Sequence, residues 1–394
     1  MDHGHPRVPL MPAPTVTVSE RGRRRLRNKH PWVFSNEITA KPDVPAGTPV
    51  EVRDERGHFI GSGYYNPHTL IAVRILSHHG PFDLSARIAA AVDFRRRLYG
   101  DASCRLVYGE SDGLPGLIVD RYGDTLVVQI LTAGMEQMRD EVIRLLTEHA
   151  RPSRILLRND SAYRKLEGLT QQNQWVLGEP MESAIVETDG LRLLVDLSSG
   201  QKTGFFLDQQ ENRRRVAAYA HGSSFLDVFS YSGAWALYAA SAGMQKITAV
   251  DSSEDALSWA KKNADLNGYS IITVVDDAFE FLRKKYSTPE RYDMIVLDPP
   301  AFCKSRKQAD EALKGYREIN LRAMKLLQRG GVLFTCSCSQ PVTPDLFLDM
   351  LREAASDSGR AFVLREFLLH PPDHPVLLHF PESLYLKCAI LELV

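Results

Sequence analysis

From about Leu191 to the C-terminus, short apolar runs alternate regularly with longer amphipathic segments. The apolar runs predict strands at 225–229, 247–251, 272–276, 293–298, 332–338, 362–369 and 385–394, with helices in most of the gaps. Strands that alternate with helices form a mostly parallel sheet with helices on both faces. The sequence therefore predicts a Rossmann-like α/β domain whose functional site lies at the carboxyl ends of the strands.

Two blocks of different character precede this region. Residues 15–78 contain short strands joined by polar turns, which is typical of a small β-barrel. Residues 79–188 mix helices with strands and predict an α+β domain, in which the polar stretch 171–174 is interpreted as a break. Residues 1–14 are expected to be a disordered leader, which leaves 189–394 for the α/β domain. Several domains are expected, because single cores rarely exceed about 250–300 residues.

Composition excludes some classes of protein. With 44% hydrophobic and 25% charged residues, the chain resembles a soluble globular protein. It has no run of about 18 apolar residues, as a membrane helix needs. The five cysteines are scattered and form no C-x-x-C pair, so the sequence predicts no metal site and a reducing, cytoplasmic location. A net charge of −1 gives no overall attraction for nucleic acid.

Positive charge is nevertheless concentrated near the N-terminus. The cluster consists of Arg21, Arg23, Arg24, Arg25, Arg27 and Lys29. Trp32, Phe34, Tyr64 and Tyr65 follow it within the same block. Clustered cations beside aromatic rings suit contact with RNA phosphates and bases. A solvated helix with the rings in the barrel core has the same sequence pattern, so both interpretations stay open.

Acidic residues stand at the ends of successive predicted strands. The first strand runs into a turn that contains Asp227, Phe229, Ser230, Tyr231 and Ser232. Gly233 is the only glycine there, which argues against a dinucleotide site. The second strand ends at Asp251 and Ser252, where a carboxylate can bind ribose hydroxyls. Asp277 and Ala278 follow the third strand, where adenine could be held. Each acid alone would more often cap a helix, but together they predict a nucleoside site.

The fourth and fifth strands end in groups that suit chemistry on a base. Asp298 is followed by two prolines, which stiffen a loop that can position a planar ring. Carbon 5 of a pyrimidine attacks a methyl sulfonium only after a thiolate has added to carbon 6. Cys338, at the end of the fifth strand, is the candidate nucleophile, with Asp298 orienting the base. Cys336 lies one step deeper and is interpreted as structural, and Cys303 is the reserve.

These motifs resemble the bacterial 23S ribosomal RNA (cytosine-C5)-methyltransferases that carry an N-terminal PUA domain. The resemblance covers nearly the whole chain and is most specific in the stretches 199–213, 227–233, 298–302, 373–378 and 382–387. It implies a class I fold, S-adenosylmethionine as cofactor, and 23S ribosomal RNA, free or in an assembling particle, as substrate. It also implies that the first stretch lies over the cofactor, with Lys202, Phe206 and Asp208 beside it, and that Cys338 is the nucleophile.

Two other functions stay open at this point. Related enzymes on the same scaffold methylate guanine N7, which has its own lone pair and needs no thiol, so only Cys338 favours cytosine. Other families place a cysteine directly after the two prolines, where this chain has Ala301, so nucleophile release must use another arrangement. The third possibility is an RNA-binding assembly factor without catalysis. The sequence leaves the oligomeric state open, a homodimer included.

Overall fold

The computed structural model of the chain describes residues 13–198, 200 and 203–394. Most of the predicted leader, and Lys202, therefore lie outside the described residues. The chain divides into two compact units, and neither is one continuous stretch. The first unit comprises Met1–Gly100, Cys104–Pro180 and Leu377–Pro381, and the second comprises Asp101–Ser103, Met181–Val376 and Glu382–Val394.

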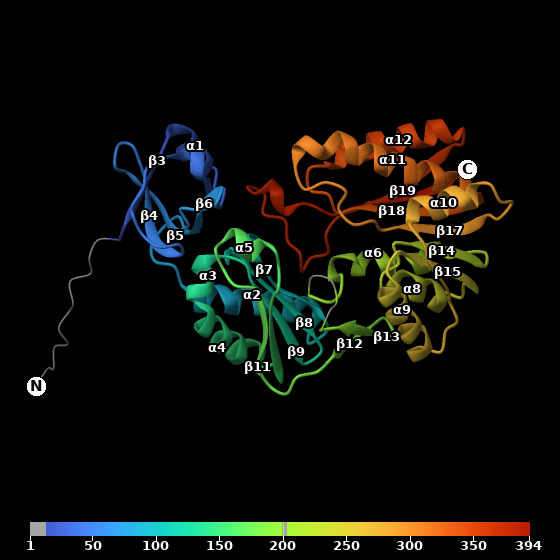
Figure 1. Ribbon diagram of the computed structural model, residues 1–394, viewed down its shortest axis with the longest axis horizontal. Coiled ribbons are helices and arrows are strands. Elements are labelled where there is room, and N and C mark those ends of the chain that lie inside the picture. The colour runs from blue at the N-terminus through green and yellow to red at the C-terminus, as the bar shows by residue number, and fades with distance from the viewer. Residues whose placement is uncertain (1–12, 199, 201–202) are drawn as a thin grey trace, which may run out of the picture. The chain divides into compact units, whose positions relative to one another are not determined.

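The first unit begins with a six-stranded sheet in the order β2-β6-β5-β4-β1-β3 (Figure 1). Its strands are β1 (Thr15–Val18), β2 (Trp32–Phe34), β3 (Ile38–Ala40), β4 (Thr48–Asp54), β5 (Phe59–Tyr65) and β6 (Ile71–Ser77). The basic segment forms helix α1 (Glu20–Arg27), which begins where the Ser19 side chain accepts a hydrogen bond from the N–H of Gly22. Leu26 of this helix packs into the strand core. The predicted small barrel thus encloses a core of its own.

The rest of the first unit is a five-stranded sheet in the order β11-β10-β9-β8-β7. Its elements are α2 (Leu84–Tyr99), β7 (Cys104–Tyr108), β8 (Leu117–Tyr122), β9 (Thr125–Ile130), α3 (Ala133–Gln137), α4 (Arg139–Ala150), β10 (Arg154–Asn159), α5 (Tyr163–Leu166) and β11 (Gln172–Leu177). The predicted break at 171–174 is wrong, because β11 pairs with β10 there. The first half of β11 is an exposed edge, so it carries polar residues in place of an apolar pattern.

The second unit is built on a seven-stranded sheet in the order β16-β15-β14-β17-β18-β20-β19. The strands are β14 (Ser224–Val228), β15 (Lys246–Asp251), β16 (Ile272–Val275), β17 (Tyr292–Leu297), β18 (Leu327–Ser337), β19 (Phe362–Leu368) and β20 (Lys387–Leu393). Strands β14 to β18 run parallel, and β20 runs antiparallel to its neighbours. The strand order reverses beside β14. In open α/β sheets the ligand crevice lies at such a reversal, outside the carboxyl ends of the strands, which here are those of β14 and β17.

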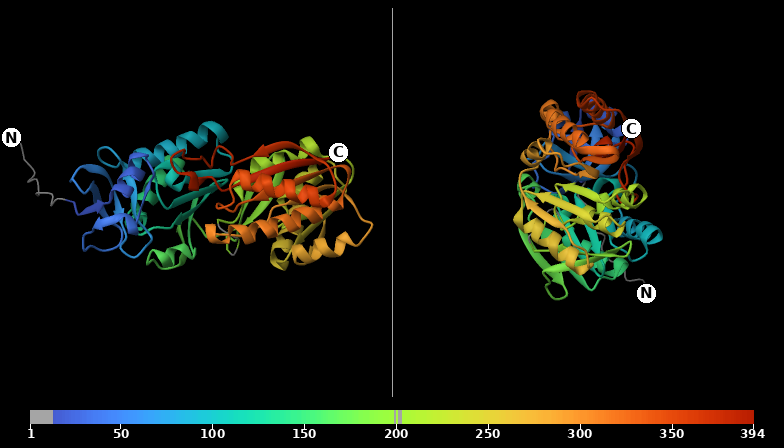
Figure 2. Two further views of the ribbon diagram at one scale, coloured as in Figure 1. Left: turned by 90° about the horizontal axis from the view of Figure 1, so that it is seen from above. Right: turned by 90° about the vertical axis from the view of Figure 1, so that its right-hand side faces the viewer.

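Helices cover both faces of this sheet (Figures 1 and 2). They are α8 (Ala234–Ser241), α9 (Glu254–Leu266), α10 (Ala278–Tyr286), α11 (Ala309–Leu326) and α12 (Pro344–Ser358). Residues of α10, α11 and α12 share one core with the strands. Helices α8 and α9 pack against β14, β15 and β16, and also against β13 (Leu191–Asp196), which forms a hairpin with β12 (Ser183–Thr188). Among the described helices, none is long and apolar enough to cross a membrane.

Candidate active site

The turn after β14 has a strained backbone. Phe229 and Tyr231 have φ values of 66° and 49°, a region that side chains other than glycine rarely adopt. Ser230, between them, is buried, and its hydroxyl has no hydrogen-bond partner among the described residues. Gly233 also has a positive φ of 76°, and a Cβ there would lie 2.9 Å from the Cβ of Ala260 in α9. Backbone strain beside an unsatisfied buried hydroxyl is typical of a ligand site.

Asp251, at the end of β15, holds the same turn. Its Oδ2 accepts a hydrogen bond of 2.9 Å from the N–H of Tyr231, and its Oδ1 accepts one of 3.0 Å from the N–H of Ser253. Each carboxylate oxygen has a second lone pair, so Asp251 can still accept hydrogen bonds from hydroxyl groups. The neighbouring Ser252 is exposed. The ends of β14 and β15 thus come together as the sequence predicts.

Asp277 lies farther along the same edge, after β16. Its Oδ1 accepts a hydrogen bond of 3.1 Å from the N–H of Glu280, so Asp277 caps α10. Ala278 is the buried first residue of that helix. The capping role therefore holds for Asp277, and a contact between its exposed side chain and a cofactor stays a prediction.

Asp227 is fully buried inside β14. Its Oδ2 accepts a hydrogen bond of 3.1 Å from the N–H of Ala236 in α8, and its Oδ1 has no partner among the described residues. Burial is the main reason that the pKa of this carboxyl rises to about 8. Asp227 therefore fixes the start of α8 and, through it, the turn that contains Ser230.

Asp298, at the end of β17, is held by two side-chain donors. Nε2 of Gln209 donates to Oδ1 at 2.7 Å, and Nε1 of Trp235 donates to Oδ2 at 2.9 Å. Burial raises the pKa of Asp298, and the hydrogen bond from Trp235 and the nearby charge of Arg213 only partly offset this effect. The carboxyl is thus fixed in one orientation at the centre of the crevice.

The sequence interpretation missed Gln209, Arg213 and Trp235 as site residues. Arg213 is fully enclosed, donates to the carbonyl oxygen of Phe206 at 2.9 Å and lies near the charge of Asp298. Gln209 and Arg213 belong to the specific stretch 199–213, Gln209 to the short helix η3 (Leu207–Gln209) and Arg213 to α6 (Gln210–Arg214). The only signal in the sequence was a dense polar run in a segment that turns out to be buried.

The stretch 199–213 contacts the turn after β14 where it is described. The hydroxyl of Tyr231 donates to the carbonyl oxygen of Gly204 at 3.3 Å. The rings of Phe206 and Tyr231 meet edge to face, with 5.4 Å between their centroids. Asp208 is buried and accepts a hydrogen bond of 2.5 Å from the hydroxyl of Tyr385. Phe206 and Asp208 therefore lie at this site.

Cys338 stands directly after β18 and is partly exposed, whereas the other four cysteines are buried. Its sulfur lies 3.7 Å from the carbonyl oxygen of Pro299, in the loop that follows Asp298. This contact confirms that the fourth and fifth strand ends share one crevice, as the parallel pairing of β17 and β18 requires. Cys336 is fully buried opposite Cys388, and burial raises the pKa of its thiol well above the usual value.

Comparison with known proteins identifies the family of this chain. A family model described as S-adenosylmethionine-dependent methyltransferase matches residues 154–380, and a PUA-like domain model matches residues 16–78. The ribosomal RNA large subunit methyltransferase I of Klebsiella pneumoniae (strain 342) is 37% identical over 95% of this chain and 97% of its own length. The chain belongs to this family of S-adenosylmethionine-dependent methyltransferases. The enzyme of the same name from Escherichia coli O157:H7 is 38% identical over 94% of this chain and 97% of its own.

Solved structures show the same fold for this methyltransferase. "A putative sam-dependent methyltransferase from Streptococcus mutans" superposes with a TM-score of 0.82 at 19% identity, over 96% of this chain and 99% of its own. Another methyltransferase structure, complexed with SAH, superposes with a TM-score of 0.81 at 18% identity. The predicted class I fold and the dependence on S-adenosylmethionine are therefore confirmed.

The residues of the crevice fit this cofactor. The unsatisfied Ser230 hydroxyl and the spare acceptor capacity of Asp251 would hold its polar groups at the ends of β14 and β15. Phe206 and Tyr231 offer ring surface beside them. When bound, S-adenosylmethionine supplies an electrophilic methyl group. Asp298 and Cys338 are the polar groups of this chain that stand at the neighbouring strand ends.

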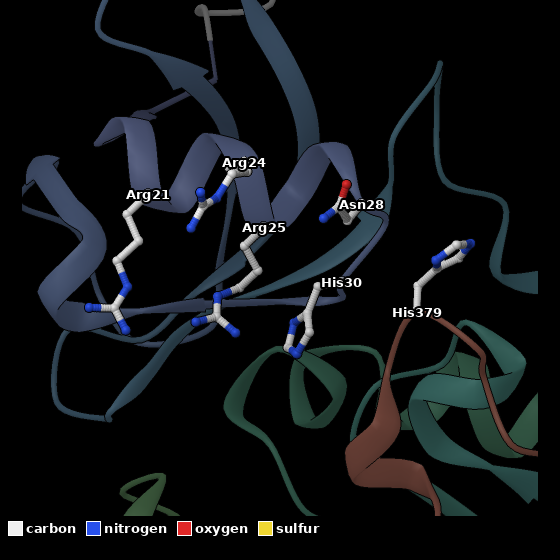
Figure 3. Close-up of a pocket in the computed structure, with 6 residues that line it drawn as sticks. All are labelled: Arg21, Arg24, Arg25, Asn28, His30 and His379. Carbon is white, nitrogen blue, oxygen red and sulfur yellow. The ribbon is translucent and has the colours of Figure 1, made fainter.

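The cations of the basic segment lie on two faces of α1. One face points into a hollow of about 370 Å³, lined by Arg21, Arg24, Arg25, Asn28, His30 and His379 (Figure 3). The other points into a hollow of about 480 Å³, whose lining includes Arg23, Arg27, Lys29, Asp54, His58, His78 and His79. Asp54 lines the second hollow, and Glu37 accepts a hydrogen bond of 3.0 Å from Nε of Arg25, which lines the first. The single basic surface expected from the sequence is therefore divided in two.

Three of the four aromatic residues near the basic segment, Trp32, Tyr64 and Tyr65, are held in packing contacts within the first unit. Tyr64 and Tyr65 are buried. Nε1 of Trp32 donates to a carboxylate oxygen of Glu110 at 2.8 Å, and the ring of Phe380 packs against Trp32 with 4.6 Å between centroids. Of the two interpretations left open by the sequence, packing in the core is correct for the tyrosines, and Trp32 is held by neighbours on two sides.

Proposed function

We propose that this methyltransferase transfers the methyl group of S-adenosylmethionine to carbon 5 of a cytidine in 23S ribosomal RNA, with Cys338 as the nucleophile. The observation that carries the proposal is the position of the Cys338 thiol, which is partly exposed and lies against the loop after Asp298. The names of the relatives and the PUA-like N-terminal domain support large-subunit ribosomal RNA as the substrate.

The chemistry requires a thiolate on one face of the base. Cys338 adds to carbon 6, a new S–C6 bond forms, and carbon 5 becomes nucleophilic enough to take up the methyl group. Loss of the carbon 5 proton then restores the double bond and expels the thiolate. Asp298, fixed by Gln209 and Trp235, holds the base in this orientation.

The proposed cofactor pocket combines the strand ends with the stretch 199–213. Its proposed members are Lys202, which lies outside the described residues, and Phe206, Asp208, Asp227, Phe229, Ser230, Tyr231, Ser232, Asp251, Ser252, Asp277, Ala278 and Asp298. Asp251 would accept hydrogen bonds from the ribose hydroxyls, and Ser230 would bind through its unsatisfied hydroxyl. Asp227 would act through α8, because its carboxylate is enclosed in β14.

The RNA backbone would lie along the face of α1 that carries Arg21, Arg24 and Arg25. Arg21 and Arg25 lie 3.7 and 3.0 Å from a carboxylate oxygen of Glu37, but Arg24 has no ion-pair partner among the described residues. On the other face, Arg23 is paired with Glu20 and lies 3.9 Å from Asp54. Unbalanced cations attract phosphates more strongly than cations that already have an acidic partner. With ribosomal RNA as substrate, the enzyme would act in the cytoplasm, where its thiols would stay reduced.

Mass spectrometry of nucleosides from 23S ribosomal RNA tests the proposal. The RNA, free or in particles, is incubated with S-adenosylmethionine and either the wild type, Cys338→Ala or, as the matched control, Cys303→Ala. We expect Cys338→Ala to bind S-adenosylmethionine normally but to form no 5-methylcytidine, and Cys303→Ala to stay active. Retained activity of Cys338→Ala with 7-methylguanosine as product would favour guanine N7 chemistry. No methyl transfer by the wild type would favour an assembly factor.

A further inference from the structure

Lys387, the first residue of β20, is almost completely buried, with 1% of its surface exposed. It faces Ser337 across the antiparallel pair of β18 and β20. Its Nζ donates hydrogen bonds to the carbonyl oxygens of Ser339 at 2.8 Å and Tyr385 at 2.7 Å. Among the described residues, no carboxylate forms an ion pair with it. A buried ammonium that is balanced only by neutral carbonyl groups is costly, and such groups cluster at functional sites.

Ser339, which accepts one of these hydrogen bonds, is the residue next to Cys338. Its Oγ accepts a hydrogen bond of 3.3 Å from the N–H of Cys303 and lies 2.9 Å from the hydroxyl oxygen of Tyr316. Lys387 and Tyr316 therefore hold the segment that carries Cys338 from two different elements, β20 and α11. Of these two residues, Lys387 is the one that brings a positive charge to the segment of Cys338.

The titratable groups around Lys387 are thiols, phenols and the imidazole of His370, whose Nε2 accepts a hydrogen bond of 2.9 Å from the N–H of Leu386. Burial lowers the pKa of Lys387 to about 8, and the nearby Cys338 and Cys303 thiols work in the opposite direction. Burial is the main cause that raises the pKa of Tyr316 to about 12, so its hydroxyl is neutral near pH 7. The hydroxyl of Tyr385 donates a hydrogen bond to Asp208. The thiols of Cys338 and Cys303 are therefore the groups whose negative charge would interact favourably with the ammonium of Lys387.

We propose that Lys387 is a positioning residue for the methyl transfer, whose ammonium holds Cys338 as the thiolate that attacks carbon 6. The S–H bond of Cys338 breaks, the proton passes to solvent at this partly exposed site, and the electron pair stays on sulfur, where the charge of the ammonium stabilises it. The same charge stabilises the thiolate when the S–C6 bond breaks after methyl transfer. This inference rests on the proposed role of Cys338 as nucleophile.

The pH dependence of thiol alkylation tests this role without any RNA. Iodoacetamide is added to the full-length protein at pH 5.5–10, and the modified peptide with Cys338 is quantified by mass spectrometry. The four buried cysteines serve as the unreactive reference. We expect the alkylation midpoint of Cys338 to rise by about one pH unit or more in Lys387→Gln and Lys387→Met, because the thiolate loses its cation. Lys387→Arg keeps the charge, so its alkylation midpoint should stay close to the wild-type value.

Tyr316→Phe is the matched control, because it loosens Ser339 without a change in charge. We expect this variant to keep the wild-type midpoint. An unchanged midpoint in both neutral Lys387 variants, or an equal shift in Tyr316→Phe, would overturn the inference. If one neutral variant does not fold, as judged by its melting curve, the other decides. Methylation that persists in Cys338→Ala would refute the cytosine proposal separately, since the alkylation assay reports only on the thiol.

Discussion

The sulfur of Cys338 lies 3.7 Å from the carbonyl oxygen of Pro299, so the end of β18 meets the stiff loop that follows β17. The thiol belongs to a strand end and the loop to its neighbour, and the parallel register of the two strands sets their distance. A base held against this loop would present one face to the sulfur.

This contact predicts a trapped adduct. RNA with 5-fluorocytidine at the target position should become covalently attached to Cys338 after methyl transfer. Release of the thiolate requires loss of the carbon 5 proton, and the fluorine that replaces this proton cannot be removed by a base. The adduct would be visible as an RNA-linked band in a denaturing gel, and Cys338→Ala should abolish it. A band that persists in that variant would point to another nucleophile, and no band with the active wild type would favour guanine N7.

The position of Asp251 predicts its effect on cofactor affinity. Asp251→Ala removes the carboxylate that orders the turn after β14 and could bind ribose hydroxyls. The dissociation constant of S-adenosylmethionine, measured by calorimetry, should rise about 10- to 100-fold, as expected for hydrogen bonds to a charged group. Asp255→Ala, in the exposed first turn of α9, should leave it nearly unchanged. Equal effects of both substitutions would contradict the assignment.

The two faces of α1 should differ in RNA binding. Arg24→Ala should weaken binding of 23S ribosomal RNA fragments several-fold and reduce the slope of log K against log salt by about 1, as expected for one lost phosphate contact. Arg27→Ala, on the same helix but in the hollow with Asp54, is the matched control. Filter binding over a range of salt concentrations measures both. A larger loss in Arg27→Ala would place the RNA on the other face.

The raised pKa of Asp227 predicts a pH dependence of stability. Its carboxyl titrates near pH 8 in the folded protein and near 4 when unfolded, so only the folded state keeps its proton between these values. The stabilisation from this group is complete below pH 4 and is lost as the pH rises through 8. Over this window it is on the order of several kcal/mol, at about 1.4 kcal/mol per pKa unit.

Asp227→Asn cannot ionise, so its melting temperature should fall less between pH 5 and pH 8 than that of the wild type. Thermal melts of the cofactor-free protein at several pH values measure this difference. Parallel curves for the two proteins would show that Asp227 is already ionised in the folded state.

The sequence predicted what depends on local pattern. The strands of the α/β domain and the acids at their ends follow from apolar runs and from the residue that stops each run, so Asp251 and Asp298 were found where they lie. Trp235 and Lys387 were missed because the role of each depends on a hydrogen bond to a residue distant in the chain. The indole of Trp235 binds Asp298, and the ammonium of Lys387 binds Ser339. The polar edge strand β11 was missed for a related reason, since only its pairing with β10 makes it a strand.

Phe380 packs on Trp32 within the first unit, although almost the whole chain separates the two residues. On a ribosome the block that contains Trp32 emerges well before the segment that carries Phe380. The first unit can therefore reach its final packing only after that later segment has been synthesised. Until then, the indole of Trp32 lacks this ring contact.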